Sequence, residues 1–485
     1  MPFYRFQAMH KISIRLHNYK HPPKKIEKDL TSGPLLKQIL LFSIPLVLTS
    51  FLLHAFKTAD IIVLGAFVGD NAVAAVGSTT SLISLITNLF IGIAVGVNVM
   101  VSRYVGANDD ESLKRTIGMT IPLSLIFGGI LMIIGLCLSR TMLELMGSDP
   151  NVIDLSTKYL KIYFLGVPLV VLYNFTSAIM RASGDTVRPL FYLIIGGFIN
   201  VGLNLFFVLV LKKDVEGVAI ATITSQGVSA ILCIISLFRA KGRVKLEIKY
   251  LKIYKKELLN VLKIGLPSGI QSSLFSLANV TLQSSINSFG ENAMAGSSYA
   301  AEFDVYIYAC MNSIAVALMS FISQNYGAKN YKRIKKSIIY AMIINIVLGI
   351  IIGVTVVIIG SPIIRTITNT EEVIYYFTRR NLISSLTYFL CGIMEVLSYS
   401  VRGLGKSFIS MVITLLCACV FRIAWVLIVV QSTRNFDMIW WSYTISWVLC
   451  SLVFTPLILS MLKKLKAEIF NAKIEKERTV TLDNL

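Results

Sequence analysis

The chain has 485 residues, of which 55% are hydrophobic and only 15% are charged, and its mean hydropathy is +0.72. Soluble globular chains are about 25% charged, so this composition excludes an ordinary soluble protein and favours an α-helical protein that crosses a membrane many times. The net charge of +20 would suit a nucleic-acid partner, but no nucleic-acid-binding motif accompanies it. We therefore expect no nucleic acid among its partners.

Apolar segments bounded by charged residues, glycine and proline predict twelve membrane-spanning helices. In chain order, the expected spans are 36–67, 71–105, 112–138, 155–181, 186–211, 215–239, 258–289, 292–326, 334–360, 373–402, 406–431 and 437–462. Several of them exceed the roughly 20 residues that a bilayer requires. We expect these longer helices to tilt, bend or protrude.

Nearly half of the 46 lysines and arginines lie in three segments outside the predicted spans, at residues 1–35, 239–256 and 463–485. Basic clusters beside membrane helices are typical of the cytoplasmic side. We therefore expect a cytoplasmic N-terminal extension at 1–35, a basic cytoplasmic connector at 240–257 and a basic cytoplasmic tail at 463–485. Both termini would then face the cytoplasm of a multi-pass protein in a bacterial inner (plasma) membrane.

The second half of the chain repeats the first at an offset of 221 residues. Gly69 falls on Gly290, Ser102 on Ser323, Gly106 on Gly327, Arg181 on Arg402 and Gly184 on Gly405. Six helices per half is an even number, so both halves enter the membrane from the same side and form parallel repeats. The expected lobes are residues 36–239 (N-lobe) and 258–462 (C-lobe).

Positions kept in both halves are predicted to serve the shared fold. The paired glycines are expected in cytoplasmic turns between helices, and the paired arginines at cytoplasmic helix ends, where a cation favours the helix C-terminus and anionic headgroups. These structural positions are Gly106, Arg181, Gly184, Gly327, Arg402 and Gly405.

Five segments carry a family resemblance: "GDNAVAAVG", "SRYVGAND", "MRASGDTVRPL", "SQNYGAKNYKR" and "SVRGLGKS". In this order on twelve spans, the chain resembles multidrug and toxic compound extrusion (MATE) transporters over roughly residues 30–462. The resemblance implies an all-α, V-shaped fold of two six-helix lobes around a central cavity. It also implies export of small organic cations in exchange for H⁺ or Na⁺, by a protein that we expect to be a monomer among membrane lipids.

Signals of enzymatic chemistry are missing from the sequence. It contains no nucleotide-binding loop and no cluster of histidine and cysteine with metal-ligand spacing. The seven cysteines all fall within apolar runs, which favours buried thiols. We therefore predict neither an enzyme nor a metal site, and no cofactor other than the coupling ion.

Ionisable residues within the spans are few, and the segment "HAFKTAD" holds Lys57 and Asp60. The resemblance places a membrane carboxylate at Asp60, in the pattern D-x-x-x-x-G that ends at Gly65, as part of the cation or proton site. Lys57 lies three residues earlier on the same helical face. It either forms a salt bridge that lets both charges enter the bilayer, or occupies the cation's place until Asp60 takes a proton.

Two asparagines in the fifth span, Asn200 and Asn204, lie four residues apart and share a helical face. They resemble the N-x-x-x-D pattern of the family, whose aspartate joins the first carboxylate at the cation site. Here Asn204 stands in place of that aspartate. An amide oxygen can coordinate Na⁺ but cannot titrate. The alternative interpretation is hydrogen bonding between helices.

The second half supplies three acidic residues within its spans: Glu302, Asp304 and Glu395. Their counterparts in the first half are Ser81, Ile83 and Asn174, none of them charged. We expect Glu302, Asp304, Glu395 and Asn174 to line an acidic substrate cavity that attracts organic cations. The alternative is that the carboxylates pair with Arg422 or with Arg379 and Arg380.

A lipid-linked saccharide flippase of the same superfamily is the alternative function. Such a protein would be expected to line its cavity with cations that hold a pyrophosphate group. The charges within the spans here are mainly acidic, with Asp60, Glu302, Asp304 and Glu395 against Lys57 and Arg422. This balance favours cationic substrates.

Overall fold

The computed structural model describes residues 28–483; residues 1–27, most of the predicted N-terminal extension, and residues 484–485 lie outside the described part. Within it, all regular structure is helical. The first half contains α2 (Leu35–Phe67), α3 (Asp70–Ala107), α4 (Asp110–Leu145), α5 (Ile153–Ala182), α6 (Val187–Leu205), the π-helical segment η1 (Phe206–Val210) and α7 (Val215–Phe238).

The second half begins after a single 3₁₀ turn, η2 (Ile248–Tyr250). It contains α8 (Lys255–Asn287), α9 (Glu291–Gly327), α10 (Tyr331–Ile367), α11 (Glu371–Gly403), α12 (Ser407–Thr414), η3 (Leu415–Val420), α13 (Phe421–Trp425), η4 (Val426–Val430), α14 (Gln431–Thr433) and α15 (Asp437–Asp483). The run from α12 to α14 follows the chain without a break and includes two π-helical segments. The predicted all-helical fold with six long helices in each half is confirmed.

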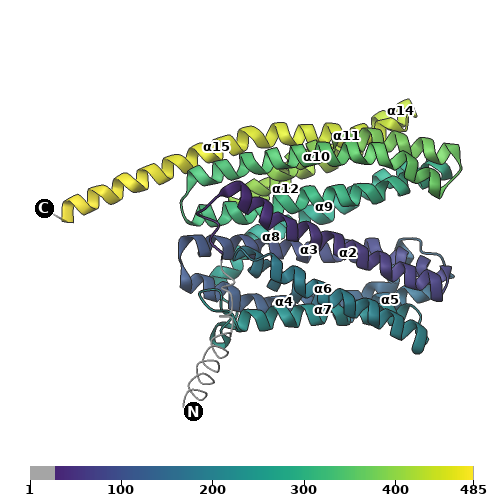
Figure 1. Ribbon diagram of the computed structural model, residues 1–485, viewed down its shortest axis with the longest axis horizontal. Coiled ribbons are helices and arrows are strands. Elements are labelled where there is room, and N and C mark those ends of the chain that lie inside the picture. Colours follow the sequence, from purple (N-terminus) through teal and green to yellow (C-terminus); the bar gives the residue numbers. More distant parts are fainter. Residues whose placement is uncertain (1–27, 484–485) are drawn as a thin grey trace, which may run out of the picture.

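Eleven helices in the described part are long and apolar enough to cross a membrane. The twelfth, α8, is less apolar because polar residues such as Gln271, Ser276 and Asn279 occupy its middle. The C-terminal helix is longer than predicted, because α15 continues to Asp483 instead of ending at residue 462 (Figure 1). The lysines after residue 462 end the apolar stretch, but lysine is a good helix former and does not end the helix.

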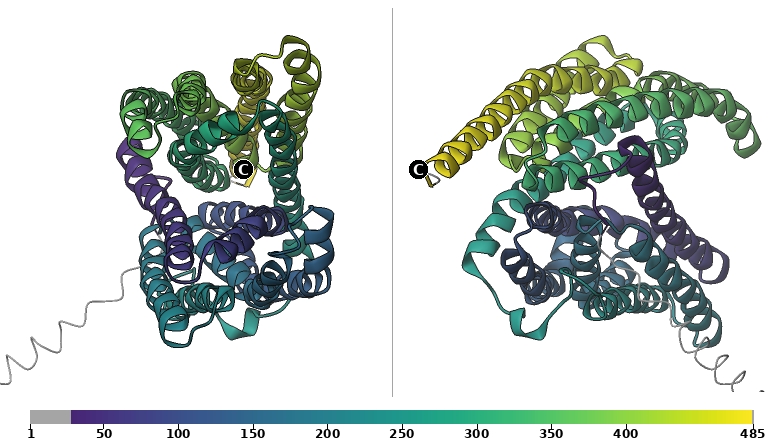
Figure 2. Two further views of the ribbon diagram at one scale, coloured as in Figure 1. Left: turned by 90° about the vertical axis from the view of Figure 1, so that its right-hand side faces the viewer. Right: turned by 60° about the vertical axis from the view of Figure 1, so that its left-hand side comes forward.

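The helices gather in two groups, with α3–α7 on one side and α9–α15 on the other, while α2 and α8 lie between them (Figure 1). The end-on view shows α2 and α8 along opposite sides of the molecule (Figure 2, left). Each of these helices begins by packing into the opposite half. Ile39 and Phe42 of α2 belong to the core of the C-lobe, whereas Val261 and Ile264 of α8 belong to the core of the N-lobe. This exchange ties the two lobes together.

The two repeats reproduce the same local geometry at the predicted offset. The Ser102 hydroxyl donates to the Ala182 carbonyl at 3.2 Å, and the Ser323 hydroxyl donates to the Gly403 carbonyl at 3.1 Å. Positive φ angles also repeat, as in the turns at Gly184 (93°) and Gly405 (83°). Because glycine has no Cβ, it adopts this conformation without strain. Both glycines lie in turns between helices, where the sequence placed them.

The lobes meet where α3 and α9 cross. A Cβ atom on Gly106 would lie 1.8 Å from the Gln324 carbonyl oxygen, and one on Gly327 would lie 2.1 Å from the Arg103 carbonyl oxygen. Both glycines therefore lie in the last turns of helices, not in the following loops, because the crossing requires backbones without side chains. The Ser320 hydroxyl also donates to Asn98 Oδ1 at 3.1 Å.

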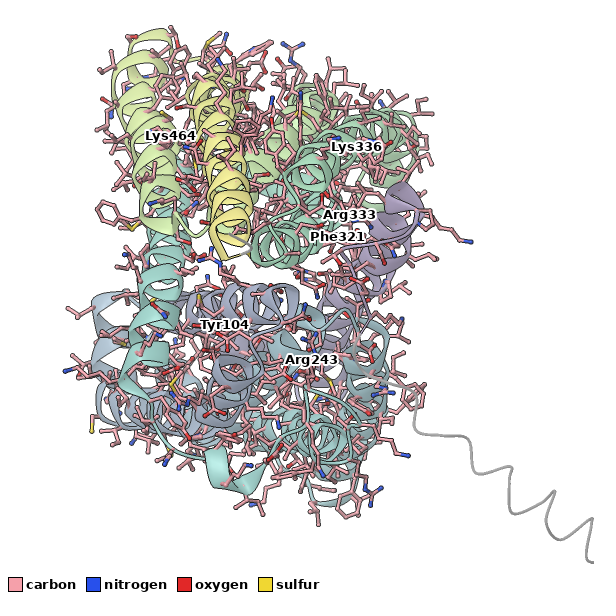
Figure 3. All side chains as sticks on the ribbon, turned by 90° about the vertical axis from the view of Figure 1, so that its left-hand side faces the viewer. Tyr104, Arg243, Phe321, Arg333, Lys336 and Lys464 are labelled. Carbon is pink, nitrogen blue, oxygen red and sulfur yellow. The ribbon has the colours of Figure 1, made fainter. Side chains whose placement is uncertain are left out.

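We call this end of the molecule, where the described chain begins and α15 ends, the basic end; the opposite end is the far end. Figure 3 shows it with Arg243 on the N-lobe, and Arg333 beside α2. Arg333 donates to the carbonyl oxygens of Leu30 and Gly33 at 2.9 Å each, which fastens the segment before α2 to α10.

The basic connector between the lobes is docked on α4. Arg243 donates to Asn108 Oδ1 at 2.7 Å, and the Tyr250 hydroxyl donates to Glu111 at 3.1 Å. Lys114 forms an ion pair with Glu247 at 2.9 Å, and this hydrogen bond holds the pKa of Glu247 below its ordinary value. The connector therefore packs against the N-lobe at several points.

Candidate functional site

A buried carboxylate lies where three helices of the N-lobe meet. Asp60 on α2 is 7% exposed. Its Oδ1 accepts a hydrogen bond from Asn204 Nδ2 on α6 at 2.5 Å, and its Oδ2 accepts one from the Thr222 hydroxyl on α7 at 3.2 Å. Asn200 extends the network, because its Nδ2 lies 3.4 Å from Thr222 Oγ1 and its Oδ1 lies 3.4 Å from Asn204 Nδ2. We call these four residues the N-lobe site.

The N-lobe site brings together three of the four residues that the sequence predicted there, Asp60, Asn200 and Asn204, and adds Thr222. The sequence analysis missed this threonine because its position carries neither a charge nor a family pattern. The only signal was the stretch "AIATITSQ", whose four polar residues the sequence does not rank. A polar group inside a membrane helix faces a partner or a cavity, and here the partner of Thr222 is Asp60.

Lys57 is not part of the N-lobe site. It is exposed, and within the described residues no hydrogen bond or ion pair joins it to Asp60. The predicted salt bridge is therefore absent. Asp60 is buried and directs its carboxylate to α6 and α7, whereas the Lys57 side chain, almost one turn earlier on α2, is exposed. Within the described residues no cation lies at ion-pair distance from Asp60, and the charge of Lys57 acts on it from further away.

The donor atoms of the N-lobe site suit a small cation. Asn204 Oδ1 is buried and has no hydrogen-bond partner, and it belongs to the residue that binds Asp60. Together, the carboxylate and this amide oxygen offer the hard oxygen ligands that alkali cations prefer. The carboxylate alone can take a proton instead. Asn200 and Thr222 would hold the geometry in either case.

The second site is a cavity of about 510 Å³ in the C-lobe. Helices α8, α9, α11, α13 and α15 line it, with Asn88 of α3 at its N-lobe side. Its aromatic lining consists of Phe275, Tyr308, Tyr388, Tyr399, Trp440, Tyr443 and Trp447. The polar residues in the middle of α8 face this C-lobe cavity, which explains the lower hydropathy of that helix. The volume suits a small organic molecule.

The charges of the C-lobe cavity differ from the prediction. Two carboxylates, Asp304 and Glu395, line it as expected, but so do Arg380, Arg402 and Arg422. The predicted acidic excess is therefore wrong for this cavity. Sequence analysis assigned Arg402 to the headgroups, but that side chain is 5% exposed and stacks on Tyr399 at 4.4 Å. Arg181, its counterpart, donates to Ser177 on its own helix at 3.1 Å.

Two further residues predicted to line the cavity do not do so. Glu302 is exposed on α9, where the neighbouring Tyr306 packs against Phe51 and His54 of α2. Asn174 lies on α5, and its Nδ2 donates to the Val170 carbonyl oxygen of the same helix at 2.9 Å. Glu302 and Asp304 lie two residues apart, so their side chains diverge by about 200° around the helix, and of the two only Asp304 lines the cavity.

Asp304 and Arg380 form an ion pair, one of the alternatives that the sequence analysis gave for the carboxylates. Arg380 Nη2 lies 2.7 Å from Asp304 Oδ2, and the guanidinium also donates to the Ser297 carbonyl at 2.5 Å and stacks on Trp440. We expect Arg380→Gln to lower the free energy of unfolding by about 2 kcal/mol, because it leaves a largely buried carboxylate unpaired. Thermal unfolding in detergent measures this effect.

The double variant Asp304→Asn/Arg380→Gln is the control for that prediction. It removes both charges and should recover most of the lost stability. A double variant no more stable than Arg380→Gln would show that stacking on Trp440, and not the ion pair, holds Arg380 in place.

The fold and its two sites define a polytopic helical transporter built from two six-helix repeats. The sequence profile of the MatE family matches residues 45–206 and again residues 267–428. The chain belongs to the MatE family, and the double match agrees with the internal duplication.

Named relatives agree with this membership, and a solved structure has the same fold. "Probable multidrug resistance protein YoeA" of Bacillus subtilis (strain 168) is 28% identical over 376 residues, which cover 76% of this chain and 81% of the relative. "Multidrug export protein MepA" of Staphylococcus aureus (strain MSSA476) is 23% identical over 427 residues, covering 87% and 92%. A solved multidrug resistance MATE family transporter in an outward-facing conformation has a TM-score of 0.84 at 22% identity, covering 90% of this chain and 98% of that one.

Proposed function

We propose that this protein is a secondary-active exporter that works by alternating access and binds its coupling cation, H⁺ or Na⁺, at Asp60. The observation that carries the proposal is a buried carboxylate whose described hydrogen-bond partners are both neutral, namely Asn204 and Thr222. A charged side chain at the bilayer centre costs about 2.5–3.5 kcal/mol on insertion scales. A bound cation or proton removes most of that penalty, so the occupancy of Asp60 can bias the lobes between two states.

The conformation fits one stage of such a cycle. The lobes are in contact at the basic end, through the α3–α9 crossing. The basic charges favour the cytoplasm of a bacterial plasma membrane for this end, so the cavity would open to the outside in this state. Alternating access then requires the α3–α9 crossing to separate. One chain contains both lobes and both sites, which supports action as a monomer surrounded by membrane lipids.

The substrates that we propose are small organic cations with aromatic character. The aromatic lining of the C-lobe cavity offers flat apolar surfaces, and such rings attract cations. Glu395 is 8% exposed, lines the cavity and forms no ion pair within the described residues, so it can meet a cationic group. The names of the relatives favour multidrug export and do not support the flippase alternative.

Transport in liposomes tests the proposal. Purified protein would be reconstituted, and ethidium movement followed while a pH gradient or a Na⁺ gradient is imposed across the membrane. We expect one of the two gradients to drive ethidium against its concentration gradient, and an ionophore that collapses that gradient to stop it. Ethidium movement that ignores both gradients would contradict ion-coupled export.

A further inference from the structure

One arginine in the C-lobe cavity has no described partner for its charge. Arg422 is 2% exposed; its Nε donates to the Ser446 hydroxyl at 2.8 Å, and its Nη2 is buried without a hydrogen-bond partner. No ion pair within the described residues includes it. An unpaired buried guanidinium inside a membrane protein is a functional-site candidate, because no negative charge in the described part of the chain pairs with it to offset its desolvation.

The remaining charges of the cavity can neutralise one another. Arg380 pairs with Asp304 at 2.7 Å, and the charge of Arg402 acts on Glu395 without an ion pair between them. The cavity holds three arginines and two carboxylates, which leaves one positive charge in excess. Arg422 is therefore a surplus positive charge, and the cavity has room for one negative charge on a ligand.

The backbone around Arg422 is also irregular. The residue lies in α13, a helical stretch of five residues between the π-helical segments η3 and η4. π-helical turns are rare and occur frequently at functional sites. The wider turns rotate α13 relative to α12, and so help to set the face on which Arg422 meets α15. This second observation is independent of charge.

Aromatic rings hold the guanidinium by its face. Its central carbon lies 4.1 Å from the ring centre of Tyr443, 5.5 Å from Phe275 and 5.9 Å from Trp447. Stacking on a ring occupies the face of a guanidinium and leaves N–H groups at its edge, where a carboxylate binds through two parallel hydrogen bonds. The same rings form walls for a flat ligand body.

We propose that Arg422 is an anion-binding subsite of the C-lobe cavity that takes the carboxylate of aromatic substrates. Compounds that combine an aromatic body with one carboxylate would then be bound and exported, beside the organic cations. A single carboxylate matches the single surplus charge, whereas a dianionic phosphate would exceed it. This inference rests on the proposed export function, which it deepens by naming a second substrate class.

Two dyes that differ in one group test the subsite. Rhodamine B carries a free carboxylate, and its ethyl ester is a cation with the same ring system. Binding to purified protein would be measured by fluorescence anisotropy for wild type and Arg422→Gln. We expect the substitution to raise the Kd of rhodamine B by about 10-fold or more, which is the loss of affinity that removal of a hydrogen bond to a charged group causes. The Kd of the ester should rise by less than about 3-fold, because the ester has no carboxylate for Arg422 to bind. Equal weakening for both dyes, or no change for either, would overturn the proposal.

Three controls keep the outcome interpretable. Arg434→Gln removes an exposed charge beyond η4 and should leave both Kd values unchanged. Arg422→Lys keeps the charge but loses the planar fork, and should weaken rhodamine B binding less than Arg422→Gln does. If Arg422→Gln fails to fold, competition on the wild type decides: 1-naphthoate should displace rhodamine B better than the neutral 1-naphthamide, and equal displacement would refute the subsite.

The subsite and the export function can fail separately. Ion-driven transport of the rhodamine ester depends on Asp60 and not on Arg422. Absence of that transport together with carboxylate-selective binding would refute ion coupling and leave the subsite in place. Ion-driven transport of the ester, together with equal binding of the two dyes, would support ion-coupled export and refute the subsite.

Discussion

Asp60→Asn is expected to reduce ion-driven ethidium transport at least about 100-fold while leaving the protein folded. The asparagine is almost the same size and can still accept a hydrogen bond from Thr222 or Asn204, which bind Asp60 in the native protein. It cannot take a proton, and it offers a cation no negative charge. The coupling ion then loses its preference for one state, and a ligand without differential affinity shifts no equilibrium.

Two measurements separate loss of coupling from loss of structure. Transport in liposomes under each gradient gives the coupling, and ethidium binding in detergent should remain within about 3-fold of wild type, since the C-lobe cavity is not altered. Asp154→Asn is the matched control, because this aspartate is exposed at the far end of α5 and pairs with Arg140 at the surface. Ion-driven transport by Asp60→Asn at the wild-type rate would remove Asp60 from the coupling mechanism.

The N-lobe site was largely predictable because its polar groups follow helical spacing. Asn200 and Asn204 are four residues apart, so one face of α6 had to present both. Asp60 stood out as a carboxylate in an apolar run. Thr222 did not, because a hydroxyl in a membrane helix can bond to its own backbone, as Thr222 also does with the Val218 carbonyl. Its role depends on how α7 packs beside α2, which the sequence does not state.

The C-lobe cavity was harder to predict because its charges depend on helix rotation. Arg380 and Arg402 lie 22 positions apart on α11, and both turn inward. The sequence offered Arg380 as a partner for a carboxylate and assigned Arg402 to the membrane surface. Near Arg422 the regular helical period itself fails, because η3 and η4 add wider turns on either side. A helical wheel drawn on α-helical geometry therefore gives the wrong face there.

The internal duplication was easier to predict, because several matched residues also have matched local geometry. Asp109 and Asn330 occupy corresponding positions, and each caps a helix by accepting from a backbone N–H three residues later. Such pairs need only local sequence, so an offset read from the chain predicts them. The packing of α2 and α8 into the opposite lobes depends on contacts between residues far apart in the sequence. The repeat pattern therefore does not predict it.

A methyl group at the α3–α9 crossing should shift the whole conformational equilibrium. In Gly106→Ala, the new Cβ would lie 1.8 Å from the Gln324 carbonyl oxygen, so the two helices must separate. Overpacking of this kind costs about 3 kcal/mol at the upper end of its range, and 1.4 kcal/mol is tenfold in an equilibrium constant. We expect the state closed at the basic end to lose population by roughly 100-fold relative to states in which the lobes part there.

Spin labels at Glu111 and Lys332, which occupy corresponding positions on α4 and α10, would report the separation of the lobes at the basic end. Gly77→Ala is the control on the same helix, because a Cβ there meets nothing within 4 Å.

Gly327→Ala should reproduce the effect of Gly106→Ala, since its Cβ would meet the Arg103 carbonyl oxygen in the equivalent place. If both glycine variants keep the wild-type distance distribution, the crossing does not hold the lobes closed. If they widen it equally, the two repeats contribute symmetrically to one gate, and Gly106 and Gly327 serve the closure of that gate and not the turns beside it.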